Sequence, residues 1–371
     1  MSSTPVLAPD DILDQLRAAV QAADAEQARA LARRLLDDDA AELFENLDST
    51  QLTELAQMLG TETVADLLSQ LTEQAAADVL EQLPIEHAAD VLEEIDPDDA
   101  ADIIVELDPG VSEDILVAME PADLAEIREL MAYRPDTAGG IMTPEFVAMA
   151  PSIRADRAVA ALRRVAEEAE TINYVYVTNP DDTLEGVLSL HRLVLSRPDT
   201  PVSDLMYRDP IRVHVDDDQE EVARTLTERH LLAIPVVDDG NRLVGIITAD
   251  DVADVIEDET TEDIELLGGS LALNEPYLTA SPFLLFRKRI VWLLVLFMAQ
   301  FVTLEVYDHY RGVLETQIVL AMFVPILIGT GGNVGSQTVT TIIRAMAVGE
   351  AAPRHFVRIL GKELMTAIGL G

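Results

Sequence analysis

The chain has 371 residues, enough for two or three domains at about 150 residues each and too many for a single small module. It carries 68 Asp and Glu against 25 Lys and Arg, a formal net charge of −43, and this balance excludes a nucleic-acid binder, whose basic surface must neutralise phosphates. The absence of cysteine excludes thiol catalysis, disulfide frameworks, iron–sulfur clusters and cysteine-ligated zinc.

An acidic residue recurs every 12 positions in the N-terminal part, and each time Leu, Val or Ile follows it. The repeated residues are Glu42, Glu54, Asp66, Asp78, Asp90, Asp102, Asp114 and Glu126. One straight helix would spread them around its circumference, because 12 residues at about 100° each leave a remainder of about 120°. Prolines that stop or begin helices punctuate the same stretch at Pro84, Pro97, Pro109 and Pro121. We therefore predict a stack of short helices, an all-α superhelical domain or α-solenoid, in residues 1–131.

The function of these repeated carboxylates has two interpretations. We favour a solvated helical face for most of them, with contact to a metal ion by a few as the alternative. Two Lys against 23 Arg, together with the acidic excess, are typical of a surface adapted to high salt, and we assign most of the charge to this cause.

The middle of the chain has short β-rich runs that alternate with helices. The predicted elements are strands at residues 171–178 (TINYVYVT) and 184–190 (LEGVLSL), a helix at 218–230, and strands at 232–238 (LAIPVVD) and 243–248 (LVGIIT). The order is duplicated, with Gly186-Val-Leu-Ser in one copy and Gly245-Ile-Ile-Thr in the other. We predict two α/β repeats of the βαββα type, at residues 132–199 and 200–257.

Acidic residues crowd residues 250–263 more densely than any general surface property explains. They are Asp250, Asp251, Asp254, Glu257, Asp258, Glu259, Glu262 and Asp263. Like charges three or four residues apart destabilise a helix, so such a cluster favours bound cations. We expect a long connecting helix at residues 258–285.

The C-terminal residues 286–371 contain long uncharged runs, at 290–304 and 318–343. A helix needs about 20 apolar residues to cross a bilayer, so we predict spans at about 288–307 and 317–343 and the start of a third near 362. Basic residues flank these spans, whereas the loop between them is mainly acidic. By the positive-inside rule the N-terminal domains are cytoplasmic, and no cleavable signal peptide precedes them. A buried core helix is the alternative for a single run, and two such runs argue against it.

The second predicted span is the candidate ion path. Gly329, Gly331 and Gly332 have no side chains to cover the backbone polar groups, and the amide side chain of Asn333 follows them. Pro325 has no backbone N–H and so removes one helical hydrogen bond. Polar backbone at membrane depth is tolerated where it is buried in protein or lines a water-filled cavity. Close helix packing through Gly331 and Gly335 is the alternative, and both roles can coexist.

Three segments resemble the MgtE family of magnesium transporters. Residues 133–143 (YRPDTAGGIMT) resemble the opening of the family's paired CBS domains, 260–268 (TTEDIELLG) its plug helix, and 324–350 (VPILIGTGGNVGSQTVTTIIRAMAVGE) its second transmembrane helix. The resemblance implies a multidomain membrane protein: helical N domain, tandem CBS repeats, plug helix, then an incomplete transmembrane region. Family members are homodimers with five membrane helices per protomer, so this chain is expected to end as the third begins, before the helix that carries the pore's acidic site.

One departure from the family concerns nucleotides. The pattern G-h-h-[ST]-x-x-D-h has its acidic residue at Asp251 in the second repeat, but the equivalent residue in the first repeat is Arg192. The missing ribose-binding carboxylate argues against adenine-nucleotide binding.

Candidate site residues follow from the chemistry of Mg²⁺, which takes oxygen ligands, prefers one or two carboxylates and retains several waters. By resemblance, regulatory ions are expected at Asp98, Asp102, Asp218, Glu220, Asp251, Asp254, Glu259, Glu262 and Asp263. The pore-lining candidates are Pro325, Gly329, Gly331, Gly332 and Asn333.

The function that the resemblance implies is a homodimeric, magnesium-gated magnesium channel or transporter of the inner (plasma) membrane, without enzymatic activity. Bound Mg²⁺ would hold acidic faces together and close the pore, and loss of Mg²⁺ would let like charges separate. The alternative is a membrane-anchored CBS sensor that does not transport. Other divalent cations remain open as cargo, because oxygen ligands discriminate poorly among them.

Overall fold

The computed structural model describes residues 12, 15–16, 19–20, 22, 24–32, 34, 43–44, 49–165, 169–271, 273, 281–347 and 351–370. The chain divides into two compact units, of which the first extends to Thr260 and the second begins at Thr261. The two units are described separately below.

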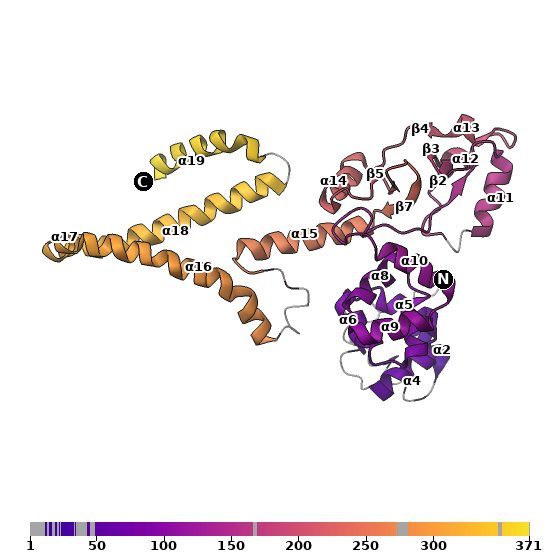
Figure 1. The fold of residues 1–371 in the computed structure, drawn as a ribbon, viewed down its shortest axis with the longest axis horizontal. Helices are drawn as coiled ribbons and strands as arrows, with labels where there is room; N and C mark the ends of the chain where they lie inside the picture. Colours follow the sequence, from indigo (N-terminus) through magenta and orange to yellow (C-terminus); the bar gives the residue numbers. More distant parts are fainter. Residues whose placement is uncertain are drawn as a thin grey trace, which may run out of the picture. The chain divides into compact units, whose positions relative to one another are not determined.

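The N-terminal part of the first unit is a stack of short helices, and from α4 onward each helix begins 12 residues after the one before it (Figure 1). The helices are α2 (Ala25–Ala32), α4 (Ser49–Leu59), α5 (Thr61–Leu68), α6 (Glu73–Leu80), α7 (Ile85–Leu92), α8 (Pro97–Glu106), α9 (Pro109–Ala118) and α10 (Pro121–Leu130). Each helix from α5 to α8 packs against the next but one. This arrangement confirms the predicted stack of short helices.

The 12-residue repeat is a repeat of buried side chains. Ala76 and Ala88 are fully buried at one repeat position, and Leu68, Leu80 and Leu92 are fully buried at another. The alanines let neighbouring helices approach closely, while the leucines fill the space between them. Proline is the first residue of α8, α9 and α10, where its missing N–H is not needed.

The repeated acidic positions are mostly solvated, as the sequence favoured. Asp66, Asp78, Asp90, Asp114, Glu54 and Glu126 are exposed, whereas Asp102 is partly buried. Glu42 lies outside the described residues. The exceptional member of the repeat is therefore Asp102.

Two βαββα units follow and confirm the predicted duplication. The first contains β1 (Ala148–Met149), α11 (Ala155–Val165), β2 (Tyr174–Thr178), β3 (Leu184–Ser189) and α12 (Leu190–Val194). The second contains β5 (Val213–His214), α14 (Gln219–Arg229), β6 (Ala233–Val237), β7 (Leu243–Thr248) and the first part of α15 (Asp251–Leu267). Between them lie α13 (Val202–Leu205) and β4 (Tyr207–Arg208).

The two sheets have the same topology. Their orders are β1-β2-β3-β4 and β5-β6-β7, each with a parallel first pair and an antiparallel second pair. The copies join through equivalent turns: the N–H of Leu184 donates to the carbonyl of Asn241, and that of Leu243 to the carbonyl of Asp182. Two boundaries differ from the predicted ones. The strand predicted from residue 171 begins three residues later, at Tyr174, and the helix predicted from residue 258 begins earlier, at Asp251.

The segment YRPDTAGGIMT links the helical stack to the second βαββα unit. The N–H of Gly139 donates to the carbonyl of Val215, and Thr143 exchanges two backbone hydrogen bonds with Ile246 of β7. Ile141, from the same segment, lines the cavity described below. The linker is thus held on the sheet whose end carries α15.

Replacing Gly140 by alanine should destabilise the first unit by about 1–3 kcal/mol, the usual cost of overpacking. A Cβ at Gly140 would lie 2.6 Å from the carbonyl oxygen of Pro135 and 2.7 Å from its Cα, and backbone atoms cannot move aside. Gly110→Ala is the matched control, because a Cβ there meets nothing within 4 Å, and alanine in α9 should be neutral or stabilising by up to about 1 kcal/mol. Thermal unfolding of both variants measures the difference; an unchanged midpoint for Gly140→Ala would contradict it.

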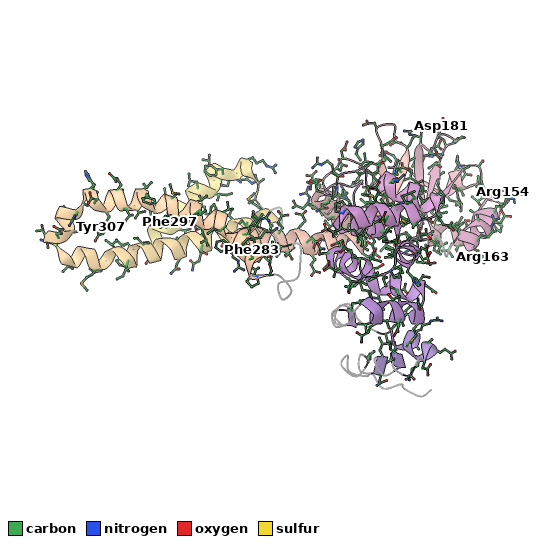
Figure 2. All side chains as sticks on the ribbon, turned by 60° about the horizontal axis from the view of Figure 1, so that its bottom comes forward. Arg154, Arg163, Asp181, Phe283, Phe297 and Tyr307 are labelled. Atoms are coloured by element: carbon green, nitrogen blue, oxygen red, sulfur yellow. The ribbon has the colours of Figure 1, made fainter. Side chains whose placement is uncertain are left out.

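The second unit is helical. Its elements are α16 (Pro282–His309), α17 (Arg311–Thr316), α18 (Ile318–Ala347), the 3₁₀ turn η1 (Pro353–His355) and α19 (Phe356–Leu370). Within the described residues, α16 is the helix that is long and apolar enough to cross a bilayer, with a mean hydropathy of 2.0 over 18 residues. Phe283, Phe297 and Tyr307 lie along it (Figure 2) and are exposed. The second and third spans remain predictions.

Candidate metal centre

An acidic cavity of about 340 Å³ lies in the first unit, where α6, α8, the linker, α14 and α15 meet. Eight carboxylates line it: Glu73, Asp98, Asp99, Asp102, Glu106, Asp251, Asp254 and Asp258. The other lining residues are Val105, Pro135, Ile141, Gln219 and Val255, so none of the described lining residues is basic. A concentration of negative charge without a basic partner requires protons or cations to neutralise it.

Two helix beginnings place the central carboxylates. Pro97 starts α8, so that Asp98, Asp99 and Asp102 fall in its first two turns. α15 begins directly after β7, and the carboxylate of Asp251 accepts hydrogen bonds from the N–H of Thr248 at 2.9 Å and its Oγ1 at 2.7 Å. Asp254 follows one turn later. Helix N-termini favour negative charge, which partly offsets the crowding.

Of these carboxyl groups, Asp98 is in the environment least favourable to its ionised form. Its residue is 9% exposed, and its buried Oδ1 has no hydrogen-bond partner among the described residues. Burial, assisted by the nearby carboxylates of Asp251 and Asp99, raises the pKa of Asp98 to about 8. An unpartnered buried acceptor of this kind is rare in folded proteins and calls for a ligand or a proton.

The same causes act on its neighbours. Burial raises the pKa values of Asp99 and Asp102 to about 7, assisted by Asp96 for the former and by Glu73 for the latter. Burial likewise raises the pKa values of Asp251, Asp254 and Asp258. At neutral pH Asp98, Asp99 and Asp102 are therefore close to their titration range, so cations and protons compete for the cavity.

The geometry fits a hydrated ion better than a fully dehydrated one. Within the described part of the chain, no group of three or more His, Asp or Glu side chains converges as a ready metal site. Mg²⁺ usually keeps several waters and meets protein through one or two carboxylates. The all-oxygen lining and the size of the cavity suit that mode of binding.

Comparison with known proteins finds matches to this chain among magnesium transporters. Residues 35–136 match the model of the MgtE intracellular N domain, 202–258 that of the CBS domain, and 324–371 that of the MgtE divalent cation transporter domain. The magnesium transporter MgtE of Thermus thermophilus is 42% identical over 247 residues, 67% of this chain and 55% of the relative. That of Enterococcus faecalis is 35% identical over 249 residues, 67% of this chain and 54% of the relative.

Solved structures of the soluble parts of magnesium transporters are also similar to this chain. The crystal structure of the soluble part of a magnesium transporter has a TM-score of 0.64 and 33% identity, covering 68% of this chain and 99% of that one. The cytosolic domain of the Mg²⁺ channel MgtE in complex with ATP has a TM-score of 0.61 and 35% identity, covering 66% and 99%. The chain belongs to the MgtE family. It spans about half the length of the MgtE relatives that it matches, 55% and 54% for the two above.

The MgtE resemblance and the order of N domain and CBS repeats are thereby confirmed. Of the predicted metal ligands, the structure brings together Asp98, Asp102, Asp251 and Asp254 in one cavity. Glu259 stands at its margin, where its Oε1 accepts a hydrogen bond of 2.7 Å from Nε2 of the lining residue Gln219.

The other predicted ligands lie elsewhere. The carboxylate of Asp218 caps α14 by accepting from the N–H of Glu220 at 3.1 Å, so local helix capping occupies it. Glu220 is exposed, and neither residue lines the cavity. Glu262 and Asp263 are exposed on the part of α15 that belongs to the second unit.

Several cavity residues were not among the predicted metal ligands: Glu73, Asp99, Glu106, Asp258 and Gln219. A signal existed for Asp99, because the first turn of α8 carries a doubled Asp where the equivalent positions of α9 are Gly110 and Val111. Asp258 follows Asp254 by one turn in the acidic run. Glu73 had no local signal, since it reaches the cavity through the packing of α6 against α8.

The two residues at the acidic position of the nucleotide pattern have different surroundings in the structure. In the first, the guanidinium carbon of Arg192 lies 4.7 Å from the centre of the Tyr207 ring. In the second, Asp251 is engaged by Thr248 and lines the acidic cavity. The expectation against adenine-nucleotide binding stays a prediction for this chain.

The predicted pore residues lie on α18, which is helical throughout the glycine segment. Pro325 is inside the helix. A Cβ added at Gly329, Gly331 or Gly332 would meet nothing within 4 Å, so the described chain does not use these glycines for close packing. Asn333 follows them on the same helix. Their role as an ion path stays a prediction.

Proposed function

We propose that the protein is a magnesium-gated magnesium channel or transporter of the plasma membrane, without enzymatic activity. The observation that carries the gating is the cavity lined by eight carboxylates, at whose centre the buried Oδ1 of Asp98 has no partner among the described residues. The cargo is proposed from the MgtE relatives, which are named magnesium transporters, and from the match of residues 324–371 to a divalent cation transporter domain.

The gating follows from electrostatics. α8 belongs to the N domain and α15 continues from the second CBS repeat toward the membrane segment. Mg²⁺ in the cavity cancels the repulsion between their carboxylates and holds the two elements together, whereas its loss leaves like charges facing one another at low dielectric. Magnesium thus acts as cargo and as switch, and the negative feedback closes the pore when the cytoplasmic concentration is high.

The assembly is proposed as a homodimer with cytoplasmic N-terminal domains and several membrane spans. An inside-negative potential drives entry of a divalent cation by roughly 4.6 kcal/mol per 100 mV, twice the value for a single charge. Gating needs differential binding of about 5.5 kcal/mol to swing a population from 1:99 to 99:1. Several weakly bound ions in one acidic cavity can supply that difference.

The repeat offers a matched test of the switch. Asp102 lines the cavity, whereas Asp90, 12 residues earlier at the same repeat position, is exposed. In proteoliposomes with the full-length gene product, Asp102→Asn should raise the Mg²⁺ concentration needed for inhibition about tenfold, since ~1.4 kcal/mol of binding is lost. Asp90→Asn should inhibit like the wild type.

Uptake is followed with a luminal Mg²⁺-sensitive dye while Mg²⁺ is varied on the side of the N-terminal domains. Equal inhibition of the two variants would contradict the switch. A complete lack of uptake at every Mg²⁺ concentration would favour the alternative function, a membrane-anchored CBS sensor. Faster uptake of Co²⁺ or Mn²⁺ than of Mg²⁺ would reassign the cargo.

A further inference from the structure

A second pocket lies in the second unit, between α18 and α19, and mixes polar and apolar side chains. Its volume is about 470 Å³, many times the roughly 30 Å³ that one water occupies in the liquid. Its polar lining residues are Gln337, Thr338, Thr341, Glu363 and Thr366, and its apolar ones are Val334, Leu360, Leu364 and Ala367. The lining therefore combines one carboxylate with neutral oxygen donors.

The hydrogen bonds leave the carboxylate largely free for a ligand. Oγ1 of Thr338 donates to Oε2 of Glu363 at 2.8 Å. The hydroxyls of Thr341 and Thr366 donate to the backbone carbonyls of Gln337 and Lys362, each one turn earlier. Their lone pairs, like the side-chain oxygen of Gln337, remain acceptors beside Glu363.

Glu363 has no positively charged partner among the described residues. None of the ion pairs among the described residues involves it, although Arg358 and Lys362 lie on the same helix. A carboxylate is partly buried here, in a segment that matches the transporter domain. Ionisable groups in membrane segments are costly, face protein or water-filled cavities, and usually mark ion pathways.

The face of α18 that meets Glu363 is continuous with the predicted ion path. Gly331 precedes Thr338 by seven residues, which is close to two helical turns and therefore the same face. Val334 and Thr341 continue that stripe and line the cavity. An ion that follows the glycine face would arrive at Glu363.

We propose that Glu363, with Thr338, Gln337 and Thr341, binds a hard divalent cation of the Mg²⁺ class between α18 and α19. This site rests on the proposed function and would be a second cation-binding site, on the ion path of the transporter. One carboxylate with hydroxyl and amide oxygens matches a cation that keeps part of its water shell. Soft metals have no thiolate or imidazole here.

The test uses Mn²⁺ as a paramagnetic stand-in for Mg²⁺. The chain has no cysteine, so Ile368→Cys accepts a single nitroxide label. Ile368 is 75% exposed and does not line the cavity, yet lies five residues after Glu363 on α19. In the full chain in detergent, Mn²⁺ at Glu363 should broaden the nitroxide spectrum at least twofold, and excess Mg²⁺ should restore it.

Three variants separate cation binding from helix packing. Glu363→Gln retains an acceptor for Thr338 but loses the charge, so it should abolish the broadening while circular dichroism shows unchanged helix content. Glu363→Asp retains the charge and should preserve the broadening at higher Mn²⁺. Glu305→Gln, on exposed α16, is the matched control and should behave like the parent.

Absence of broadening in the parent, or equal broadening in Glu363→Gln, would overturn the site. So would restoration of the spectrum by Na⁺ or K⁺ at the concentration at which Mg²⁺ acts. The measurement needs no transport, which keeps the two proposals separable. Binding at Glu363 without any flux would refute the proposed function alone, and Mg²⁺ flux without binding at Glu363 would refute this site alone.

Discussion

Removal of Mg²⁺ should lower the unfolding temperature of the first unit by about 5–10 °C at pH 8 and by much less at pH 5.5. An ion at a hundred times its dissociation constant stabilises the folded state by about 2.7 kcal/mol. For a unit of this size, 1 kcal/mol corresponds to roughly 2–4 °C. The cavity at α8 and α15 supplies the binding energy, because the folded state brings its carboxylates together and the unfolded chain separates them.

The pH dependence follows from the raised pKa values. Burial raises the pKa of Asp98 to about 8 and those of Asp99 and Asp102 to about 7, against about 3.9 in an unfolded chain. Between these limits the folded state binds more protons than the unfolded state, so the stability of the metal-free protein falls as pH rises from about 4 to about 8. Mg²⁺ replaces the protons and therefore stabilises most at the alkaline end.

Differential scanning calorimetry of the full chain in detergent, with chelator or with MgCl₂ at constant ionic strength, measures both effects. Hydrogen exchange locates them, and protection should change most in peptides from α8 and from the start of α15. A Mg²⁺ effect of equal size at pH 5.5 and pH 8 would contradict the involvement of these carboxylates. So would an effect that sodium chloride reproduces at matched ionic strength.

The helical stack was predictable because its information is local. Proline at the first position of α8, α9 and α10, and buried leucine every 12 residues, specify each helix without reference to distant parts of the chain. The duplicated βαββα unit was predictable for the same reason: β7 coincides with the apolar run LVGIIT. The boundaries were less accurate, since the first strand begins at Tyr174 and α15 begins at Asp251.

The set of residues that line the acidic cavity depends on contacts between helices that are distant in the sequence. Asp90, Asp102 and Asp114 have equivalent local sequences, yet Asp102 is the one that lines the cavity. It does so because α8 is the helix whose first turns face the start of α15, about 150 residues later in the chain. The family resemblance, together with the crowding of acidic residues, pointed to Asp251 and Asp254, which line the cavity. Glu73 required knowledge of which helices pack together.

The Asp218 candidate shows the opposite case. An acidic residue before Gln-Glu-Glu suits a metal, but it also suits the N-cap of a helix. The structure uses Asp218 for the cap, with its side chain accepting from the N–H of Glu220. A local role of this kind competes with metal binding for the same oxygen atoms, and sequence spacing does not distinguish them.

Replacing Asp98 by asparagine should have two effects of opposite sign. Without Mg²⁺ at pH 8 the variant should be more stable than the wild type by about 1–3 kcal/mol, because a buried charge without a partner costs more than a buried neutral amide. The substitution keeps the shape of the side chain and removes a charge that Asp251 and Asp99 oppose. With saturating Mg²⁺ the variant should gain less stability than the wild type, because one ligand is lost.

The control is Asp90→Asn, an exposed position on α7, where a surface substitution should change stability by less than about 0.5 kcal/mol in either condition. Calorimetry with and without Mg²⁺ gives both stabilities for each variant. A chelated Asp98→Asn protein that is less stable than the wild type would show that the Asp98 carboxylate makes a favourable contact, and the buried charge would then be structural. Stabilisation without Mg²⁺ together with a weaker response to Mg²⁺ is the result expected if Asp98 is held in a repulsive field that the cation relieves, which is the condition that an ion-operated switch requires.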